Sequence, residues 1–215
     1  RQIHLDIDYM RGYRDFTWDT TKFKNPKQFV AEMRKRGIRL MPILDAGVKQ
    51  DKDGYDIYQE GIEKGYFVEN PDGTVFVGRV WPGDAVFPDF GRPEVRNWWA
   101  KHVKFFADMS ACGVWNDMDE PASFDGELQT DLIFHDGEQK TTHTRMHNVF
   151  GHLQAQAAYE GMKAATGKRP YIITRAAYAG TQKYSTIWTG DNQSIWSHLQ
   201  LAIPQLNSLG MSGFA

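Results

Sequence analysis

The sequence predicts a parallel α/β fold with about six strands. Short apolar runs of strand length alternate with segments whose apolar residues recur at helical spacing, which is the pattern of strands joined by crossover helices. The 215 residues are fewer than the roughly 250 of a complete eight-stranded α/β barrel. No repeat, low-complexity segment or linker divides the chain, so we expect a single domain.

The first part of the chain is expected to contain a strand at 3–9, a helix from 26 to 36, a strand at 39–44 and a hairpin at 66–80. The helix from 26 is expected because Asn25 is a favoured N-cap residue and Pro26 is favoured in the first helical turn. Gly37 is expected to end this helix. The turn sequence 70–73, Asn-Pro-Asp-Gly, predicts the hairpin.

The second part is expected to contain helices from Pro93, around 146–157 and over 195–209, and strands at 113–116, 171–174, 185–189 and from Met211 onward. In the helix from Pro93, the apolar residues recur at spacings of three, four, seven and eight, which places them on one face of the helix. Pro204 lies inside the last helix and is expected to kink it.

Composition excludes several classes of protein. The net charge is −2 without a basic block, which disfavours binding to nucleic acid or to an anionic membrane through overall charge. Cys112 is the single cysteine, so neither an intrachain disulfide nor a cysteine cluster can form. Apolar runs such as 40–44 are far shorter than the roughly 18 residues of a membrane span. The chain begins at Arg1, and we interpret it as a piece of a longer protein. The sequence does not indicate the cellular compartment of that protein.

Polar side chains follow the predicted strands in succession: Asp6 and Asp8, then Asp45, Asp117, Arg175 and Asp191. The carboxyl ends of parallel strands meet at one edge, where α/β barrels hold their active sites. The pattern therefore predicts an acidic pocket with one fixed cation. Any one of these aspartates could instead cap the next turn or helix.

Two of these strand ends carry the most information. The string 114–121, Val-Trp-Asn-Asp-Met-Asp-Glu-Pro, holds three carboxylates within four residues, and Asp191 follows another Trp-bearing strand. Two carboxyl groups in different protonation states are what glycoside hydrolysis requires. The rings of Trp115 and Trp188 would suit the C–H faces of a sugar, although each could be an ordinary core residue.

The strings 5–10, 80–83, 115–121 and 188–191 resemble the signatures of glycoside hydrolase family 31, the α-glucosidases and α-xylosidases. The resemblance spans nearly the whole chain. It implies an incomplete (β/α)8 TIM barrel, with 1–215 as part of a catalytic domain and 46–91 as a hairpin-containing insertion. It also implies a retaining, exo-acting enzyme that hydrolyses terminal α-linked glucose from oligosaccharides, without a metal or an organic cofactor.

By this resemblance Asp117 is the nucleophile and Asp191 the acid and base, with carboxyl groups about 5 to 5.5 Å apart. Asp6 and Arg175 would bind the sugar, and Glu120 would orient Arg175. The remaining residues expected to line the sugar site are Ile43, Asp45, Trp81, Trp115, Met118 and Trp188.

The sequence departs from the family pattern at Asp119, where many members carry Asn, and at Gln193, where the surrounding string resembles bacterial members. Alternatives of the same family are an α-xylosidase, a transglucosidase or a lyase. Alternatives of another class are a non-catalytic sugar-binding fragment and a barrel that binds magnesium through its carboxylates.

Three further polar patterns are interpreted as ordinary helix or loop residues and not as metal sites. His143 and His147 lack the glutamate of the usual zinc motif. The acidic run 51–56 lacks ligands of a calcium loop. The polar stretch 126–142 is expected to be a mobile loop near the site.

Overall fold

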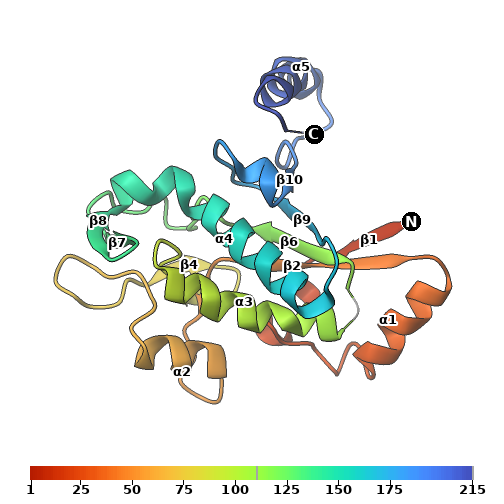
Figure 1. The fold of residues 1–215 in the computed structure, drawn as a ribbon, viewed down its shortest axis with the longest axis horizontal. Coiled ribbons are helices and arrows are strands. Elements are labelled where there is room, and N and C mark those ends of the chain that lie inside the picture. The colour runs from red at the N-terminus through yellow and green to blue at the C-terminus, as the bar shows by residue number, and fades with distance from the viewer. Residues whose placement is uncertain (110, 215) are drawn as a thin grey trace.

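The computed structural model describes residues 1–109 and 111–214, which form an open, wholly parallel five-stranded sheet with helices packed against it (Figure 1). The strands, in sheet order, are β1 (Gln2–Leu5), β2 (Arg39–Asp45), β6 (Gly113–Asp117), β9 (Tyr171–Thr174) and β10 (Thr186–Ile187). Their spatial order follows their order along the chain, as in a barrel wall. The predicted fold class, an incomplete (β/α)8 barrel, is confirmed.

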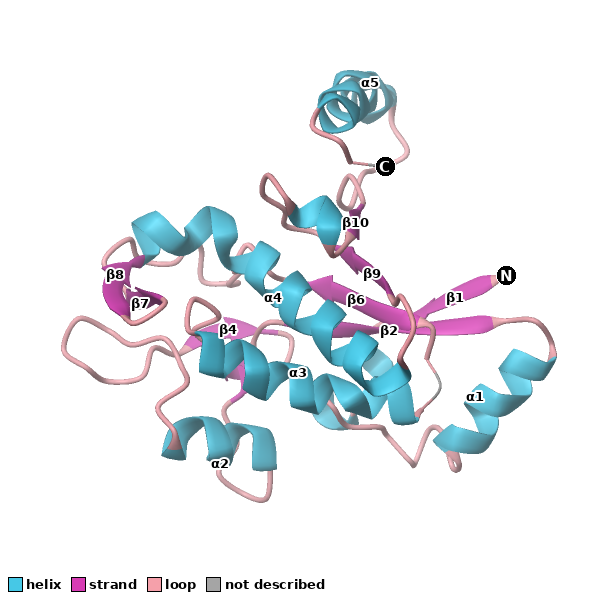
Figure 2. Ribbon diagram, viewed as in Figure 1, coloured by secondary structure: helices cyan, strands magenta, loops and turns pink. Residues whose placement is uncertain are grey.

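The helices expected from apolar periodicity are present (Figure 2). They are α1 (Pro26–Lys35), α3 (Pro93–Asp108), α4 (His143–Thr166) and α5 (Trp196–Met211). Asn25 caps α1 by accepting a hydrogen bond from the backbone N–H of Gln28 at 3.2 Å. Helix α1 packs on β2, whereas α3 and α4 pack on each other and on β6.

The close approach of α3 and α4 depends on a glycine. A Cβ atom at Gly161 would lie 2.4 Å from the carbonyl oxygen of Ala100 and 2.9 Å from its Cα atom. Beside this crossing, the ring of Phe90 meets Trp99 and Phe150 edge-on, with centroids 5.3 and 5.2 Å apart. The helical layer is therefore fixed by a backbone contact as well as by its aromatic core.

The segment between β2 and α3 contains a small antiparallel sheet, β3 (Val48–Lys49), β5 (Gly83–Val86) and β4 (Gly78–Val80), and the helix α2 (Asp56–Glu63), which was not predicted. The expected turn exists, since the backbone N–H of Asn70 donates to Thr74 at 2.7 Å. The hairpin expected over 66–80 is present next to this turn, where Glu69 pairs with Val75 and the backbone N–H of Phe76 donates to Val68 at 2.9 Å. The prediction is wrong for the end of the range, because Val80 pairs with Gly83 instead.

Other expectations are corrected by local hydrogen bonds. The first strand ends at Leu5, because the Asp6 carboxylate accepts from the backbone N–H of Ile7 at 2.7 Å and starts a 3-10 helix (Ile7–Tyr9). The strand expected from Met211 is absent from 211–214: α5 includes Met211, and Gly213 ends it in the left-handed conformation (φ 81°). The expected strand at 185–189 is only the two residues of β10.

The stretch 126–142 is more ordered than expected. It contains a hairpin made of β7 (Ile133–Asp136) and β8 (Gln139–Thr142). The Nδ1 atom of His135 lies 2.6 Å from the buried carboxylate of Asp89, and the backbone of Ile133 pairs with Glu69. These contacts join the hairpin to the segment before α3, so the prediction of a mobile loop is wrong for 133–142.

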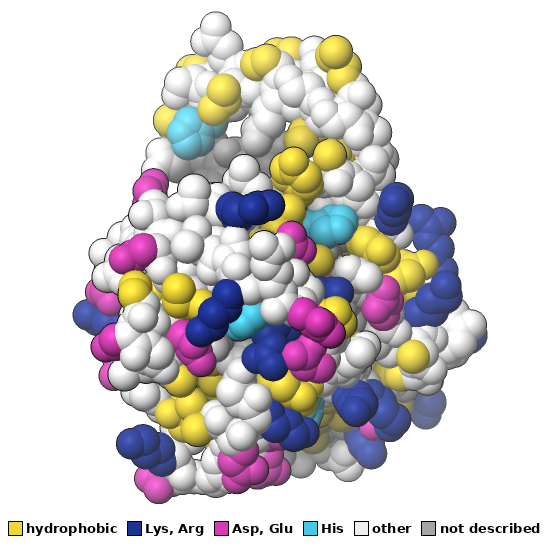
Figure 3. Space-filling view, turned by 60° about the vertical axis from the view of Figure 1, so that its left-hand side comes forward, with side chains coloured by type: hydrophobic (Ala, Val, Ile, Leu, Met, Phe, Trp, Pro, Cys, Tyr) yellow, Lys and Arg dark blue, Asp and Glu magenta, His cyan; other side chains and the backbone are white. Residues whose placement is uncertain are grey.

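Helix α5 stands apart from the rest of the chain at the top of Figure 1, and apolar side chains (yellow) lie on the surface of the same part of the molecule in Figure 3. No side chain of α5 is buried. Its exposed apolar residues include Trp196, Leu199, Leu201, Ile203 and Leu206. Pro204 lies within it. None of the helices in the described ranges is both long enough and apolar enough to cross a membrane.

The close contact between α3 and α4 predicts that an alanine at position 161 lowers the free energy of unfolding. Gly161→Ala should destabilise the fold by about 2 kcal/mol or more, because the added methyl group meets the backbone of Ala100. Helix propensity alone would instead stabilise the protein by about 1 kcal/mol. Urea unfolding measures the difference. Ala164→Gly, on the exposed face of α4, is the control for propensity; a stabilised Gly161→Ala protein would contradict the close approach.

Candidate active site

The predicted site residues gather at the carboxyl-terminal edge of the parallel sheet. Asp6 directly follows β1, Asp45 ends β2, Asp117 ends β6 and Arg175 directly follows β9. Asp191 comes four residues after the end of β10. The register sets Asp45 opposite Asp117 across β2 and β6. Parallel pairing thus brings residues that are far apart in the sequence to one edge, as expected.

Arg175 connects the edge residues through its guanidinium group. Its Nε and Nη2 atoms donate to the two carboxylate oxygens of Glu120 at 2.7 and 2.9 Å. Its Nη1 atom lies 3.2 Å from Oδ1 of Asp117, and Nη2 lies 3.3 Å from the sulfur of Met118. A two-pronged pair with Glu120 fixes the plane of the guanidinium, and therefore the direction in which it faces Asp117.

Asp119 forms hydrogen bonds with the residues on both sides of Arg175. Its buried carboxylate accepts from the hydroxyl group of Thr174 and from the backbone N–H of Ala176, the latter at 3.0 Å. Met118 has a left-handed backbone (φ 52°), which is uncommon for a residue with a side chain. Sequence reasoning treated Asp119 as a neighbour of Asp117 only. The available signal was the density of carboxylates in 117–120.

The charge state of Asp117 reflects opposing effects. Burial raises the pKa of Asp117 to about 6, and the nearby guanidinium of Arg175 and a hydrogen bond from the backbone of Met118 counteract this rise. The charges of Glu120 and Asp191 raise the same pKa. Asp191 therefore lies close enough to Asp117 for the two charges to interact. With a pKa of about 6, Asp117 is mostly ionised at neutral pH.

Two neighbouring acids hold protons more firmly. Burial, followed by the charge of Asp117, raises the pKa of Asp45 to about 8, against the effect of Arg175. Burial raises the pKa of Asp119 to about 7, although its hydrogen bond from Thr174 opposes this. The carboxyl-terminal edge of the sheet therefore holds carboxyl groups with different pKa values. Acid and base catalysis at one site requires such a difference.

Aromatic side chains lie around these acids. The rings of Trp115 and Trp188 meet edge-on with centroids 5.9 Å apart. Trp81 is 45% exposed and meets Phe124, which the sequence analysis did not select, edge-on at 4.9 Å. Ile43 lies in the core, with 1% of its surface exposed.

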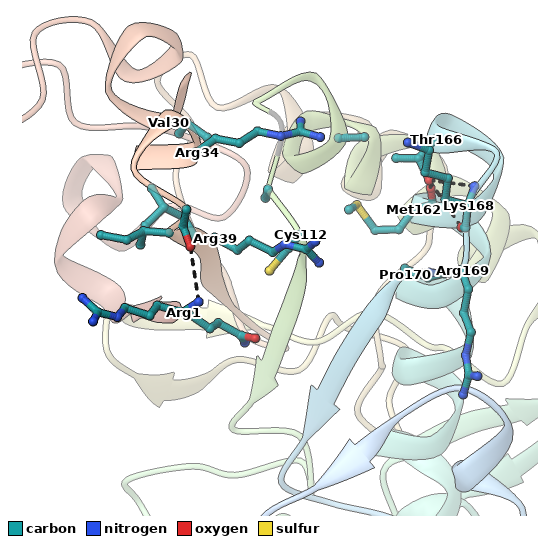
Figure 4. A pocket seen from close by; sticks show the side chains of 16 residues that line it. Arg1, Val30, Arg34, Arg39, Cys112, Met162, Thr166, Lys168, Arg169 and Pro170 are labelled. Atoms are coloured by element: carbon teal, nitrogen blue, oxygen red, sulfur yellow. Dashed lines mark hydrogen bonds between the residues drawn. The ribbon is translucent and has the colours of Figure 1, made fainter. Parts of the chain in front are cut away.

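A separate cavity of about 910 Å³ lies at the opposite end of the sheet and contains none of the predicted site residues (Figure 4). Its lining includes Arg34, Arg39, Cys112, Lys168 and Arg169. The helices α1, α3 and α4 all end beside it. Basic side chains there complement the negative ends of these helices.

The remaining histidine and aspartate patterns have partners within the protein. The Nδ1 atom of His147 lies 3.1 Å from Nε2 of His143, whose ring stacks on Phe134. Asp51 accepts from Nε of Arg14 at 2.8 Å. Within 1–109 and 111–214 the structure shows no group of three His, Cys, Asp or Glu side chains arranged to hold a metal ion.

Comparison with known proteins agrees with this geometry. Residues 1–215 match the family described as "Glycosyl hydrolases family 31 TIM-barrel domain". Alpha-glucosidase 2 of Bacillus thermoamyloliquefaciens is 47% identical over 99% of this chain and 27% of its own length. The chain therefore spans about a quarter of this curated relative.

Solved structures agree as well. The α subunit of glucosidase II, in a crystal structure described as alpha3-Glc2-bound, matches 99% of this chain and 24% of its own, with a TM-score of 0.91 and 32% identity. A Flavobacterium johnsoniae GH31 dextranase complexed with glucose matches 98% of this chain and 27% of its own, with a TM-score of 0.85 and 28% identity.

The contacts of Asp119 predict unequal effects of two substitutions. Asp119→Ala leaves the N–H of Ala176 without a partner and leaves the hydroxyl of Thr174 with only the carbonyl oxygen of Ala176, so we expect a loss of about 1 to 3 kcal/mol. Asp119→Asn keeps one acceptor oxygen and should lose about half as much. Urea unfolding of both variants measures this, and equal losses would contradict the two-sided contact.

The raised pKa of Asp45 predicts a pH dependence of stability. In the unfolded chain this carboxyl group ionises near pH 4, whereas in the folded protein its pKa is about 8, so the folded state binds the extra proton between these values. Stability therefore falls as pH rises through that window. Asp45→Asn should lose less unfolding free energy than the wild type between about pH 5 and about pH 8. Parallel curves would refute the raised pKa.

Proposed function

The chain belongs to glycoside hydrolase family 31, and from that membership and the edge geometry we propose that it forms part of a retaining, exo-acting α-glycosidase that releases terminal α-linked glucose from oligosaccharides. The observation that carries the proposal is the fixed Arg175 guanidinium, 3.2 Å from the buried carboxylate of Asp117. In this proposal, 1–215 is part of the catalytic barrel domain and 46–91 is an insertion in it.

Asp117 acts as the nucleophile. Its carboxylate attacks the anomeric carbon, and the bond to the leaving oxygen breaks as a glycosyl ester of Asp117 forms. Arg175 supports this role because its charge favours the anion that attacks, and Glu120 supports it by holding the guanidinium. The pKa of about 6 leaves Asp117 ionised at neutral pH.

Asp191 acts as acid and then as base. It gives a proton to the leaving glycosidic oxygen, and its carboxylate then takes a proton from the water that cleaves the ester. Its side chain is exposed directly after Gly190 (φ 89°), so a substrate and a water molecule can reach it. Its electrostatic effect on Asp117 supports the pairing of the two.

The other residues at the edge bind the sugar. Oδ1 of Asp45 is buried without a hydrogen-bond partner in the described protein, as expected for an acceptor of a sugar hydroxyl. Asp6 is exposed beside it and binds hydroxyls at the non-reducing end. The rings of Trp81, Trp115 and Trp188 pack on the faces of the sugar, and the site is completed by Met118 and Ile43.

The names of relatives support glucose as the sugar, because they are α-glucosidases and a dextranase complexed with glucose. An α-xylosidase or a transglucosidase would use the same nucleophile. Product analysis on glucosides and xylosides, with and without an added acceptor sugar, distinguishes these.

The nucleophile assignment predicts that Asp117→Ala in the full-length protein lowers hydrolysis of an aryl α-glucoside by about 1,000-fold or more, because no ester can form. A fluorinated glycosyl donor should label the wild type on the peptide that contains Asp117, as read by mass spectrometry. Asp108→Ala, on the exposed end of α3, is the control. Normal turnover in Asp117→Ala would refute the assignment.

The role of Asp191 predicts a dependence on the leaving group. Asp191→Ala should slow hydrolysis of natural disaccharides far more than that of substrates with acidic leaving groups, which depart without a proton. Azide should restore turnover and give a glycosyl azide, because a small anion can enter where the carboxylate stood. Equal losses on both substrate types, without azide rescue, would show that Asp191 is not the acid and base.

A further inference from the structure

Asp191, the acid and base of the proposed mechanism, lies in the segment 188–195 that joins β10 to α5 (Figure 1). Its side chain is exposed, and within 1–109 and 111–214 it takes part in no hydrogen bond or ion pair. The position of its carboxyl group therefore depends on the backbone of this segment. Proton transfer is sensitive to that position, because donor and acceptor must come within hydrogen-bond distance of each other.

The backbone directly before Asp191 has conformational freedom. Gly190 has a φ of 89°, and beyond its chain neighbours a Cβ atom at Gly190 would meet no atom within 4 Å. Surrounding groups thus do not impose this backbone conformation, and a glycine can leave it at little cost. A turn that contains this glycine needs a further contact if Asp191 is to keep one position.

Two hydrogen bonds fold the segment on itself. The backbone N–H of Asn192 donates to the carbonyl oxygen of Gly190 at 3.0 Å, and the side-chain amide of Asn192 donates to the hydroxyl group of Thr189 at 2.9 Å. These bonds join residues two or three positions apart. They shape the turn around Asp191, but they do not connect it to another element.

His198 connects this turn to α5. Its Nδ1 atom lies 2.8 Å from the backbone nitrogen of Gln193, which is two residues after Asp191. His198 is the third residue of α5, and its side chain is half-buried, whereas those of Ser197 and Leu199 are exposed. Because a backbone N–H can only donate, Nδ1 accepts this bond, and the ring proton of neutral His198 is on Nε2.

Within the described ranges, no other side chain of α5 forms a hydrogen bond with the segment. The remaining side-chain hydrogen bonds of the helix join Ser208 to Pro204 and Ser212 to Ser208. No side chain of α5 is buried. Loss of the His198 bond would therefore release the turn from α5 without disturbing a packed core.

We propose that His198 is a positioning residue for Asp191: by accepting the backbone N–H of Gln193, it holds the turn 190–193 against α5 and keeps the Asp191 carboxyl group in one place. The role rests on the proposed function, in which Asp191 gives a proton to the leaving oxygen and later takes one from water. His198 acts through Gln193 and takes no part in the bond changes. A bond that only stabilises the start of α5 would use the same two atoms, and the two roles differ in their effect on proton transfer.

Substrates that differ in their need for a proton separate the two roles. His198→Ala in the full-length protein should lower kcat/KM for maltose about tenfold or more, because the leaving sugar oxygen needs the proton of Asp191. The same variant should lower kcat/KM for α-glucosyl fluoride by less than about twofold, because fluoride departs with little help from an acid. His198→Asn should restore most of the loss on maltose, since its side-chain oxygen can accept the same N–H.

A bond that only stabilises the start of α5 gives a different result. Both substrates would then lose the same factor in His198→Ala, or neither would change while the melting temperature falls, and either result overturns the proposal. Failure of His198→Asn to restore maltose hydrolysis also overturns it. Gln200→Ala, at an exposed position of α5, is the matched control.

Hydrogen exchange measures the bond independently of activity. The amide of Gln193, read in a peptide that covers 190–195, should exchange about tenfold faster in His198→Ala than in the wild type, with His198→Asn in between. Equal exchange in the wild type and His198→Ala overturns the proposal, because His198 would then not hold the turn. If the wild-type protein hydrolyses no glycoside, the proposed function fails, and the exchange still decides whether His198 holds the turn.

Discussion

The contact between the Arg175 guanidinium and the segment 117–120 is the interaction on which the site depends. It joins the end of β9 to the end of β6 across the sheet edge, and every residue of the segment takes part in it or in its support. Glu120 fixes the guanidinium plane, Asp119 forms hydrogen bonds with the residues on either side of Arg175, and Asp117 forms an ion pair with Nη1 of the arginine. Removing the arginine would leave three carboxylates facing one another with no cation among them.

This arrangement accepts a cost in stability at the place where chemistry is proposed. Asp45, Asp117 and Asp119 all have raised pKa values because burial disfavours their charged forms. Such groups weaken a fold at neutral pH unless the rest of the core offsets them. The offset comes from the buried apolar core, to which α3 and α4 contribute Trp99, Phe106 and Phe150.

The two ends of the sheet differ in the chemistry of their side chains. The carboxyl-terminal edge collects acids and tryptophans, whereas the amino-terminal end collects basic side chains beside the ends of three helices. Parallel strands make this separation unavoidable, because all of them present the same end to the same side. Loops at the acidic edge are correspondingly elaborate, with β3–β5–β4 and the β7–β8 hairpin packed beside it.

The sequence by itself determined the strands of the sheet, the helices that cover it and the placement of Asp6, Asp45, Asp117 and Arg175 at strand ends. These follow from local periodicity and from the single direction of parallel strands. The early end of β1 and the pairing of β4 with β5 follow from local backbone hydrogen bonds that the apolar pattern does not specify. The hairpin at 133–142 is held in addition by contacts with distant segments, such as His135 with Asp89. The contacts of Asp119 likewise appear only in the three-dimensional structure. Whether a carboxyl group is buried, and which groups face it, depends on chain segments tens of residues away, and no local pattern encodes that distance.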